Sequence, residues 1–325
     1  MQPTGRKHLG NYIGAIVQCV AGQERGDGLY CIVDLHATTV PYEPSRLRES
    51  VYDTAATLLA AGLDPGRCSF FRQSDVLEHA ELCWLLSSVT AFGDLNRMHQ
   101  FKEKSGAQRE LVSAGLFSYP VLMAADVLAY RADEVPVGDD QRQHVELMRD
   151  IAQRFNARFG ETLVVPEGRF PKVGARIMDL QHPERKMSTT GSTEQGTVHV
   201  LDEPAAIVRK LRAAVTDSGA GILRAPEKAG ISNLIEILAA VRGAAPEQVE
   251  VEFEGAGYGA FKTAVSDAVI ALLAPVRERY QGLRSDEPAL ERILAAGAEQ
   301  AHAIAAATLT DVRETMGVGP VRRAR

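Results

Sequence analysis

The chain has 325 residues and a mass of 35.2 kDa, enough for one large domain or two packed domains. Hydrophobic residues make up 45% and charged residues 24% of the sequence, a balance that excludes a disordered chain. The net charge of −6 argues against coating of nucleic acid through bulk charge, so an RNA partner must meet a local basic patch.

The apolar stretches of the sequence are short. The longest, residues 268–276, has roughly half the length of a membrane span, and Gln2, Arg6 and Lys7 interrupt any apolar leader at the start. We therefore expect a cytoplasmic protein with no membrane partner. The four cysteines form no Cys-x-x-Cys pair, which favours buried thiols over a zinc site or a disulfide framework.

Hydrophobic periodicity predicts alternating helices and strands in the first half of the chain. Apolar residues at helical spacing predict a helix over residues 11–22, and a continuous apolar run predicts a buried strand over 29–34. A helix from about residue 47 to 62, a strand over 68–71 and a helix over 75–89 follow. This order is typical of an α/β fold, with a parallel sheet and helices on its faces.

The second half of the chain has a different pattern. Ala-, Leu- and Glu-rich segments at helical period lie near residues 203–215, 233–242, 261–281 and 289–315. We predict an α/β domain over residues 1–190 and a helical domain over 191–325, with the last helix a candidate for packing back on the first domain. The segment 189–196, which contains glycine and serine, is the predicted junction.

Two short motifs carry candidate chemistry. His8-Leu9-Gly10-Asn11 stands at the start of the first predicted helix, where free backbone N–H groups favour an anion and Gly10 leaves room for a flat ring. Taken alone, such a turn is most often a helix cap. Lys186-Met187-Ser188-Thr189-Thr190 is a polar loop whose lysine suits phosphate clamping, and its alternative interpretation is a solvated linker.

With these two motifs in this order, the sequence resembles the class I aminoacyl-tRNA synthetases, and among them the bacterial tryptophanyl-tRNA synthetases. The motifs correspond to the family's His-Ile-Gly-His and Lys-Met-Ser-Lys-Ser. Further strings match in order over almost the whole chain, at residues 34–38, 100–105, 119–126, 135–141, 230–234 and 257–262. The resemblance implies a doubly wound, Rossmann-like catalytic domain followed by an α-helical domain that recognises the tRNA anticodon.

The resemblance implies activation of L-tryptophan by ATP, with release of pyrophosphate, and transfer of tryptophan to the 3′ end of tRNA(Trp). Lys104, Lys186 and Ser188 would be the catalytic residues, with the lysines clamping the phosphate charge. Magnesium is expected with ATP, held largely by the phosphates. The residues implied in ATP binding are Gln2, Thr4, His8, Gly10, Asn11, Gly138, Asp140, Ile177, Lys186, Met187 and Ser188.

The resemblance also implies a tryptophan site around Asp126. This carboxylate would accept the indole N–H, the only hydrogen bond that the tryptophan side chain donates, so the site would reject phenylalanine. Met123, on the same helical face, would pack against the indole ring. The remaining tryptophan-binding candidates are Tyr119 and Gln141 for the ammonium group, His36 near the carboxylate, and Val135.

The family is homodimeric, and the apolar residues between Phe92 and Ser118 are the candidate interface, which would include Lys104. Basic residues of the helical domain are candidates for contact with tRNA phosphates, and the alternative is that they lie on ordinary solvated faces. These residues are Arg209, Lys210, Arg212 and Lys262.

Two features depart from the family's pattern. The strand that precedes the Gln-Pro-Thr-Gly turn in the family is absent from this sequence. We therefore expect either that the start of the sequence was assigned too late or that the chain was truncated. Thr189 replaces the second loop lysine, from which we expect weaker clamping of pyrophosphate. Tyrosyl-tRNA synthetase is the rival enzyme, and an auxiliary or non-catalytic paralogue that binds tryptophan or RNA is the rival of another class.

Overall fold

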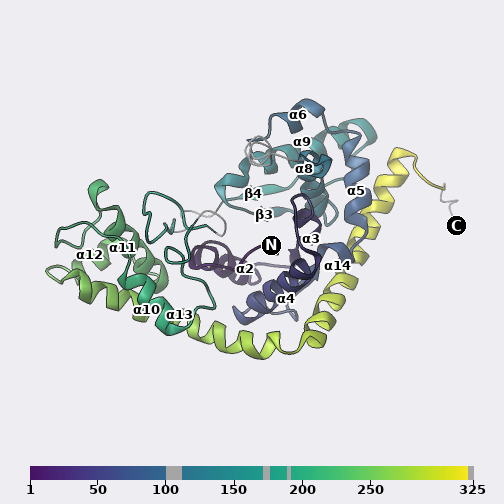
Figure 1. Cartoon of the computed structure of the whole chain (residues 1–325). Coiled ribbons are helices and arrows are strands. Elements are labelled where there is room, and N and C mark those ends of the chain that lie inside the picture. Colours follow the sequence, from purple (N-terminus) through teal and green to yellow (C-terminus); the bar gives the residue numbers. More distant parts are fainter. Residues whose placement is uncertain (100–111, 171–175, 189–191, 321–325) are drawn as a thin grey trace.

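The structure is a computed structural model, and it describes residues 1–99, 112–170, 176–188 and 192–320. Strands and helices alternate in the first half of the chain (Figure 1). The elements in this half are α1 (Leu9–Asn11), η1 (Tyr12–Ile16), α2 (Val17–Gly22), β1 (Gly28–Ile32), α3 (Asp34–Ala37), α4 (Pro44–Ala60), β2 (Cys68–Arg72), η2 (Gln73–Asp75), α5 (Glu78–Ser87), α6 (Phe92–Asn96), α8 (Ala114–Leu128), β3 (Glu134–Pro136), η3 (Asp139–Gln141), α9 (Arg142–Phe159) and β4 (Glu167–Arg169).

The strands pair in parallel, as predicted. β1 pairs with β2 along its whole length, and β3 pairs with β4. The α/β class with a following helical region is therefore confirmed. Among the described residues the strands form two parallel pairs, β1 with β2 and β3 with β4.

The first residue of the chain is hydrogen-bonded to the backbone at the end of β1. The N–H of Val33 donates to the carbonyl oxygen of Met1 at 3.0 Å, and the Met1 ammonium group donates to the carbonyl oxygen of Cys31. These two hydrogen bonds place Met1 beside the carboxyl end of β1.

Between residues 200 and 320, helices alone make up the regular structure. They are α10 (Pro204–Arg212), η4 (Pro226–Lys228), α11 (Ala229–Arg242), α12 (Pro246–Glu252), α13 (Tyr258–Arg284) and α14 (Glu287–Met316). By length and composition alone α13 could cross a membrane, but it packs against α4, α10 and α11 as a core helix does. The long helix α14 runs back along β2 and α5 (Figure 1).

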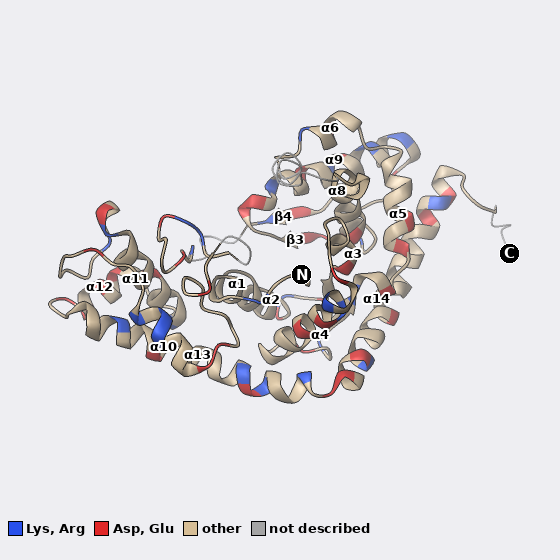
Figure 2. Ribbon diagram, viewed as in Figure 1, with Lys and Arg blue, Asp and Glu red and all other residues tan. Residues whose placement is uncertain are grey.

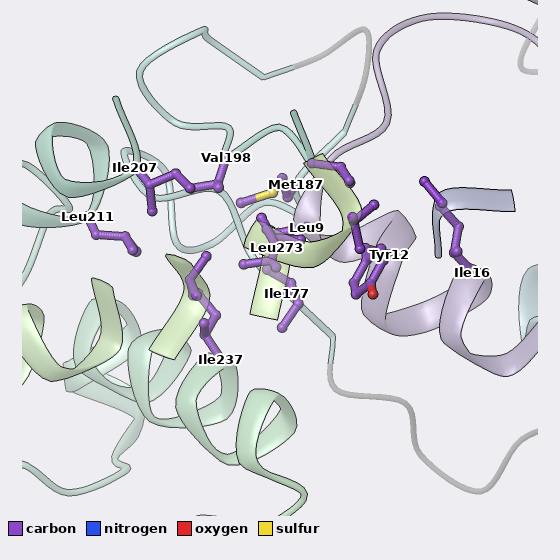
Figure 3. Close-up of a cluster of buried hydrophobic side chains, with 14 of the residues drawn as sticks. Leu9, Tyr12, Ile16, Ile177, Met187, Val198, Ile207, Leu211, Ile237 and Leu273 are labelled. Atoms are coloured by element: carbon purple, nitrogen blue, oxygen red, sulfur yellow. The ribbon is translucent and has the colours of Figure 1, made fainter. Parts of the chain in front are cut away.

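Two hydrophobic cores position the candidate site. One core joins the first helix to the loop of the second motif and to the helical region, and Figure 3 shows Leu9, Ile177, Met187 and Val198 together in it. The other core lies between β2, α5, α8, α9 and α14. Because both motifs contribute side chains to the first core, packing holds them against each other.

Candidate functional site

The carboxyl ends of β1 and β2 and one face of α8 meet at a buried polar cluster. His36 follows β1, Gln73 follows β2, and Asp126 lies on α8. The Nε2 atom of His36 donates to Oδ2 of Asp126 at 2.7 Å, and the Nε2 atom of Gln73 donates to Oδ1 at 2.6 Å. Parallel strands end at the same edge of a sheet, which is where open α/β folds bind ligands.

Asp126 also accepts a hydrogen bond from a second histidine. The Nδ1 atom of His79, whose side chain is fully buried, lies 2.6 Å from Oδ1 of Asp126. Burial alone would raise the pKa of Asp126, but the hydrogen bonds from His36 and His79 outweigh it and lower the pKa to about 2. Asp126 is therefore an ionised carboxylate at neutral pH, although only 11% of its side chain is exposed.

The other candidate tryptophan residues lie around this carboxylate. Tyr119 and Met123 precede Asp126 on α8 at spacings that share its helical face. The ring of Tyr119 lies 6.2 Å from that of His36, edge to face. Val135 and Gln141 come from other elements, β3 and η3, and both are half-buried.

Tyr119 has a polar partner of its own. Its hydroxyl group lies 2.8 Å from Nε2 of His144 on α9, and burial raises its pKa to about 12. Tyr119 therefore keeps its proton at neutral pH. The packing of α8 on α9 fixes this side chain beside the Asp126 cluster.

The first motif forms a capping box at the start of α1. The backbone N–H of Asn11 donates to Nδ1 of His8 at 3.3 Å, and the backbone N–H of His8 donates to Oδ1 of Asn11 at 3.1 Å. The His8 side chain is buried. Since Nδ1 is an acceptor, the neutral ring carries its proton on Nε2.

The backbone connects the two motifs. The N–H of Leu9 donates to the carbonyl oxygen of Val198 at 2.8 Å. The N–H of Met187 donates to the carbonyl oxygen of Ile177 at 3.1 Å. A Cβ at Gly10 would lie 3.5 Å from the Cβ of Ile177, so these candidate ATP residues come together. The chain between the motifs thus folds back to bring them to one place.

Within the second motif the side chains differ in exposure. Lys186 is exposed, Ser188 is half-buried, and the Met187 side chain is buried in the core (Figure 3). Burial, the nearby His199 and the positive charge of Lys186 lower the pKa of His8 to about 4. His8 and Lys186 are therefore electrostatic neighbours, and His8 is neutral at pH 7.

The remaining candidate ATP residues lie on two exposed turns. The carbonyl oxygens of Gln2 and Thr4 accept hydrogen bonds from Nζ of Lys7, which closes the turn before the first motif. Gly138 precedes η3, and Oδ2 of Asp140 accepts a hydrogen bond from the Gln141 side chain at 2.6 Å. Lys104 lies outside the described residues.

Sequence reasoning missed Gln73 and His79. Both are fully buried and polar, and both donate to Asp126. A signal was available for Gln73, because it directly follows the buried strand β2 at the edge where parallel sheets bind ligands. His79 carries no comparable signal, since a histidine near the start of a helix is common.

The basic residues proposed for tRNA contact do not form a single exposed set. Figure 2 shows basic residues along α10, but Lys210 is only 1% exposed, and its Nζ donates to Asp202 and to Glu194 at 2.8 Å each. Lys262 donates to the carbonyl oxygens of residues 212 and 214 at the end of α10. Lys210 is therefore a structural residue, and the expectation that it faces phosphate is wrong. Arg209 and Arg212 are exposed.

Comparison with known proteins shows the family of the chain. The family model for "tRNA synthetases class I (W and Y)" matches residues 1–274. The chain is 50% identical to Tryptophan–tRNA ligase 2 of Streptomyces avermitilis, over 99% of this chain and 96% of the relative.

Two solved structures are similar over nearly the full length. Tryptophanyl-tRNA synthetase from Mycoplasma pneumoniae superposes with a TM-score of 0.89 at 35% identity, covering 98% of this chain and 96% of that one. The enzyme from Campylobacter jejuni complexed with ADP and tryptophan gives a TM-score of 0.84 at 35% identity, covering 98% of both chains. This chain belongs to the class I aminoacyl-tRNA synthetases of the tryptophan and tyrosine family.

Proposed function

We propose that this enzyme is a tryptophan–tRNA ligase. It joins L-tryptophan to ATP, releases pyrophosphate, and transfers tryptophan from the adenylate to the 3′ end of tRNA(Trp). The observation that carries the proposal is the full-length similarity to tryptophan–tRNA ligases. The ionised, largely buried carboxylate of Asp126 supports it, because an acceptor is what an indole N–H requires.

In this proposal the cluster on α8 binds the amino acid. Asp126 accepts the indole N–H, and Met123 and Val135 pack against the ring. Tyr119 and Gln141 bind the ammonium group. His36 donates to Asp126, so its first role is to hold that carboxylate, and in this proposal it also lies close to the carboxylate of the substrate.

The two motifs bind ATP. Backbone N–H groups at the start of α1 and the side chains of His8 and Asn11 contact the phosphates and ribose, and Gly10 lies under the adenine. Lys186 and Ser188 stabilise charge that develops on the leaving pyrophosphate, together with Lys104. The buried side chain of Met187 leaves its backbone as the contacting group. The other ATP-binding residues of the proposal are Gln2, Thr4, Gly138, Asp140 and Ile177.

Magnesium belongs to the nucleotide in this proposal. Among the described residues no three His, Cys, Asp or Glu side chains converge to hold a metal ion. Mg²⁺ dehydrates reluctantly and is commonly bound through substrate phosphates, so in this proposal the phosphates of ATP supply most of its ligands. Translation takes place in the cytoplasm, and we propose the same location for this enzyme.

The enzyme works as a homodimer in this proposal, with an interface that extends the predicted segment, residues 92–118, to include α5. Phe92 at the start of that segment is 72% exposed, and Leu77 and Trp84, just before and on α5, are each 78% exposed. Large apolar side chains with such exposure favour a partner surface, and a second copy buries the same residues on both sides. Sedimentation at micromolar concentration should show a dimer, and Trp84→Glu should shift it to monomer. A wild-type monomer would contradict the proposal.

ATP–pyrophosphate exchange with tryptophan and with tyrosine tests the activity. We expect exchange with tryptophan and little with tyrosine, followed by aminoacylation of tRNA(Trp). Exchange with tyrosine alone would make the enzyme a tyrosyl-tRNA synthetase. Exchange with tryptophan but no aminoacylation would instead favour the auxiliary paralogue, for which the threonine at position 189 is the specific observation.

A further inference from the structure

The polar cluster at Asp126 includes two residues, His79 and Tyr130, that do not contact tryptophan in the proposed function. Behind the carboxylate, His79 bridges two groups. Its Nδ1 atom lies 2.6 Å from Oδ1 of Asp126, and its Nε2 atom is hydrogen-bonded to the hydroxyl group of Tyr130. The His79 side chain is fully buried, so its polar contacts come from protein groups.

The direction of the bond to Asp126 is fixed by the chemistry of the carboxylate. An ionised carboxylate only accepts, so Nδ1 of His79 carries a proton and donates to Asp126. On the other side of the ring, Nε2 is hydrogen-bonded to the hydroxyl group of Tyr130, whose pKa is raised by burial. Tyr130 therefore holds the ring of His79, and His79 in turn holds Asp126.

Gln73 is fixed in the same way. Its Oε1 atom accepts a hydrogen bond from the backbone N–H of Leu35 at 3.1 Å, which leaves its amide group to donate to Oδ1 of Asp126 at 2.6 Å. Both acceptor positions of Oδ1 are thus filled, by Gln73 and by His79. His36 fills one position of Oδ2.

A carboxylate has about four acceptor positions, two on each oxygen. Three of them are taken by protein donors, and no other donor from the described part of the chain reaches Oδ2. One position on Oδ2 therefore remains for a ligand. The direction of this free acceptor position depends on the rotation of the carboxylate group. The two hydrogen bonds that Oδ1 accepts restrict this rotation.

We propose that His79, held by Tyr130, is a positioning residue that fixes the rotation of Asp126 so that the free acceptor position on Oδ2 meets the indole N–H. This inference rests on the proposed function. His79 and Tyr130 act only through Asp126, so their loss should weaken recognition of the N–H group more than use of ATP. Specificity for tryptophan then depends on residues that do not touch it.

The test compares tryptophan with L-3-benzothienylalanine, which keeps the ring shape and replaces the N–H group by sulfur. The readout is the ratio of kcat/KM for the two amino acids in ATP–pyrophosphate exchange. Tyr130→Phe removes one hydroxyl group from a nearly unchanged shape, and we expect the ratio to fall about three- to tenfold. The KM for ATP should not change.

A second pair of variants separates positioning from packing. His79→Leu removes the donor to Asp126, whereas His79→Asn keeps an N–H near the position of Nδ1. We expect His79→Asn to restore much of the discrimination that His79→Leu loses. The matched control is Tyr280→Phe, which removes a hydroxyl group that donates to Asp53 at 2.9 Å between α13 and α4, and which should leave the ratio unchanged.

Wild-type exchange with tryptophan is measured first, because its absence would overturn the proposed function itself. Once that exchange is established, an unchanged ratio in Tyr130→Phe and in His79→Leu overturns the positioning role. Equal losses with both amino acids also overturn it, since that result indicates a purely structural contribution. A lower ratio in both variants, with rescue by His79→Asn, supports it.

Discussion

Gly297 of α14 lies directly against the carbonyl oxygen of Phe70 in β2. A Cβ at Gly297 would be 2.0 Å from that oxygen and 2.5 Å from the carbonyl carbon. Neither atom can move without shifting the strand. The absence of a side chain at Gly297 is therefore what lets α14 pack on the edge of the sheet, and through β2 this helix supports the residues that follow the strand.

We expect Gly297→Ala to lower the free energy of unfolding by roughly 1–3 kcal/mol, because the added methyl group forces α14 away from β2. Urea denaturation followed by circular dichroism measures the change. Gly282→Ala near the end of α13 is the control, since its Cβ would meet nothing within 4 Å. It should stabilise the helix by about 0.5–1 kcal/mol. Equal effects of the two substitutions would contradict the packing argument.

Lys210 should matter for stability and not for tRNA binding. Its buried Nζ is paired with Asp202, whose side chain is 5% exposed, and Lys210→Met leaves that carboxylate with only the more exposed Arg6 as a cationic partner. Removing the buried partner of such a pair costs up to about 3–5 kcal/mol. Arg209→Met, on the exposed side of the same helix, should change stability by less than about 0.5 kcal/mol. A stable Lys210→Met variant with weakened tRNA affinity would reverse this assignment.

The stability of the enzyme should decrease on mild acidification because of His8. Its pKa is lowered from 6.5 to about 4 in the folded state, so between these values the unfolded chain binds a proton that the folded chain does not. The free energy of unfolding therefore rises with pH across this window. Protonation of His8 in the unfolded chain lowers it by up to roughly 3 kcal/mol when the pH falls to 4.

Denaturation curves at pH 7 and pH 4.5 for the wild type and for His8→Asn measure this contribution. The variant lacks the titrating ring, so it should lose about 2 kcal/mol less than the wild type between the two conditions. Identical losses would show that His8 titrates normally in the folded state.

Local patterns in the sequence predicted the elements better than the contacts. Helical period and apolar runs predicted β1, β2, α4, α5, α10, α11, α13 and α14 within a few residues, because these signals depend on neighbours in the chain, whereas α8 and α9 were not predicted. The partners of Asp126 depend on contacts 47 and 53 residues away, to His79 and Gln73, and no periodicity encodes them.

Lys210 shows what a closer inspection of local pattern could have found. It shares a helical face with Ile207 and Leu211, which are buried, so its spacing predicts burial even though its charge suggests a surface. The prediction that Lys210 contacts tRNA relied on its charge and ignored its position on the buried face of the helix. The hydrogen bonds between Met1 and the backbone at the end of β1, by contrast, could be seen only in the structure.

Asp126→Asn should reduce the use of tryptophan far more than the use of ATP. The remaining oxygen of the amide must face Gln73 and His79, which donate to Oδ1, so the amide N–H₂ takes the place of Oδ2 and offers a donor to the indole N–H. Loss of a hydrogen bond to a charged acceptor costs roughly 1.5–3 kcal/mol, so kcat/KM for tryptophan should fall about ten- to a hundredfold or more.

Phenylalanine and tyrosine lack the indole N–H, so their use relative to tryptophan should rise in Asp126→Asn even if their absolute rates stay low. The control is Asp217→Asn in the helical region, where a hydrogen bond from Lys228 likewise lowers the pKa of the carboxyl group to about 2. This variant should lose stability and keep its preference for tryptophan. Exchange kinetics with each amino acid, together with a melting curve, separate the two effects. If Asp126→Asn preferred tryptophan over phenylalanine as strongly as the wild type, Asp126 would not be the residue that recognises the indole ring.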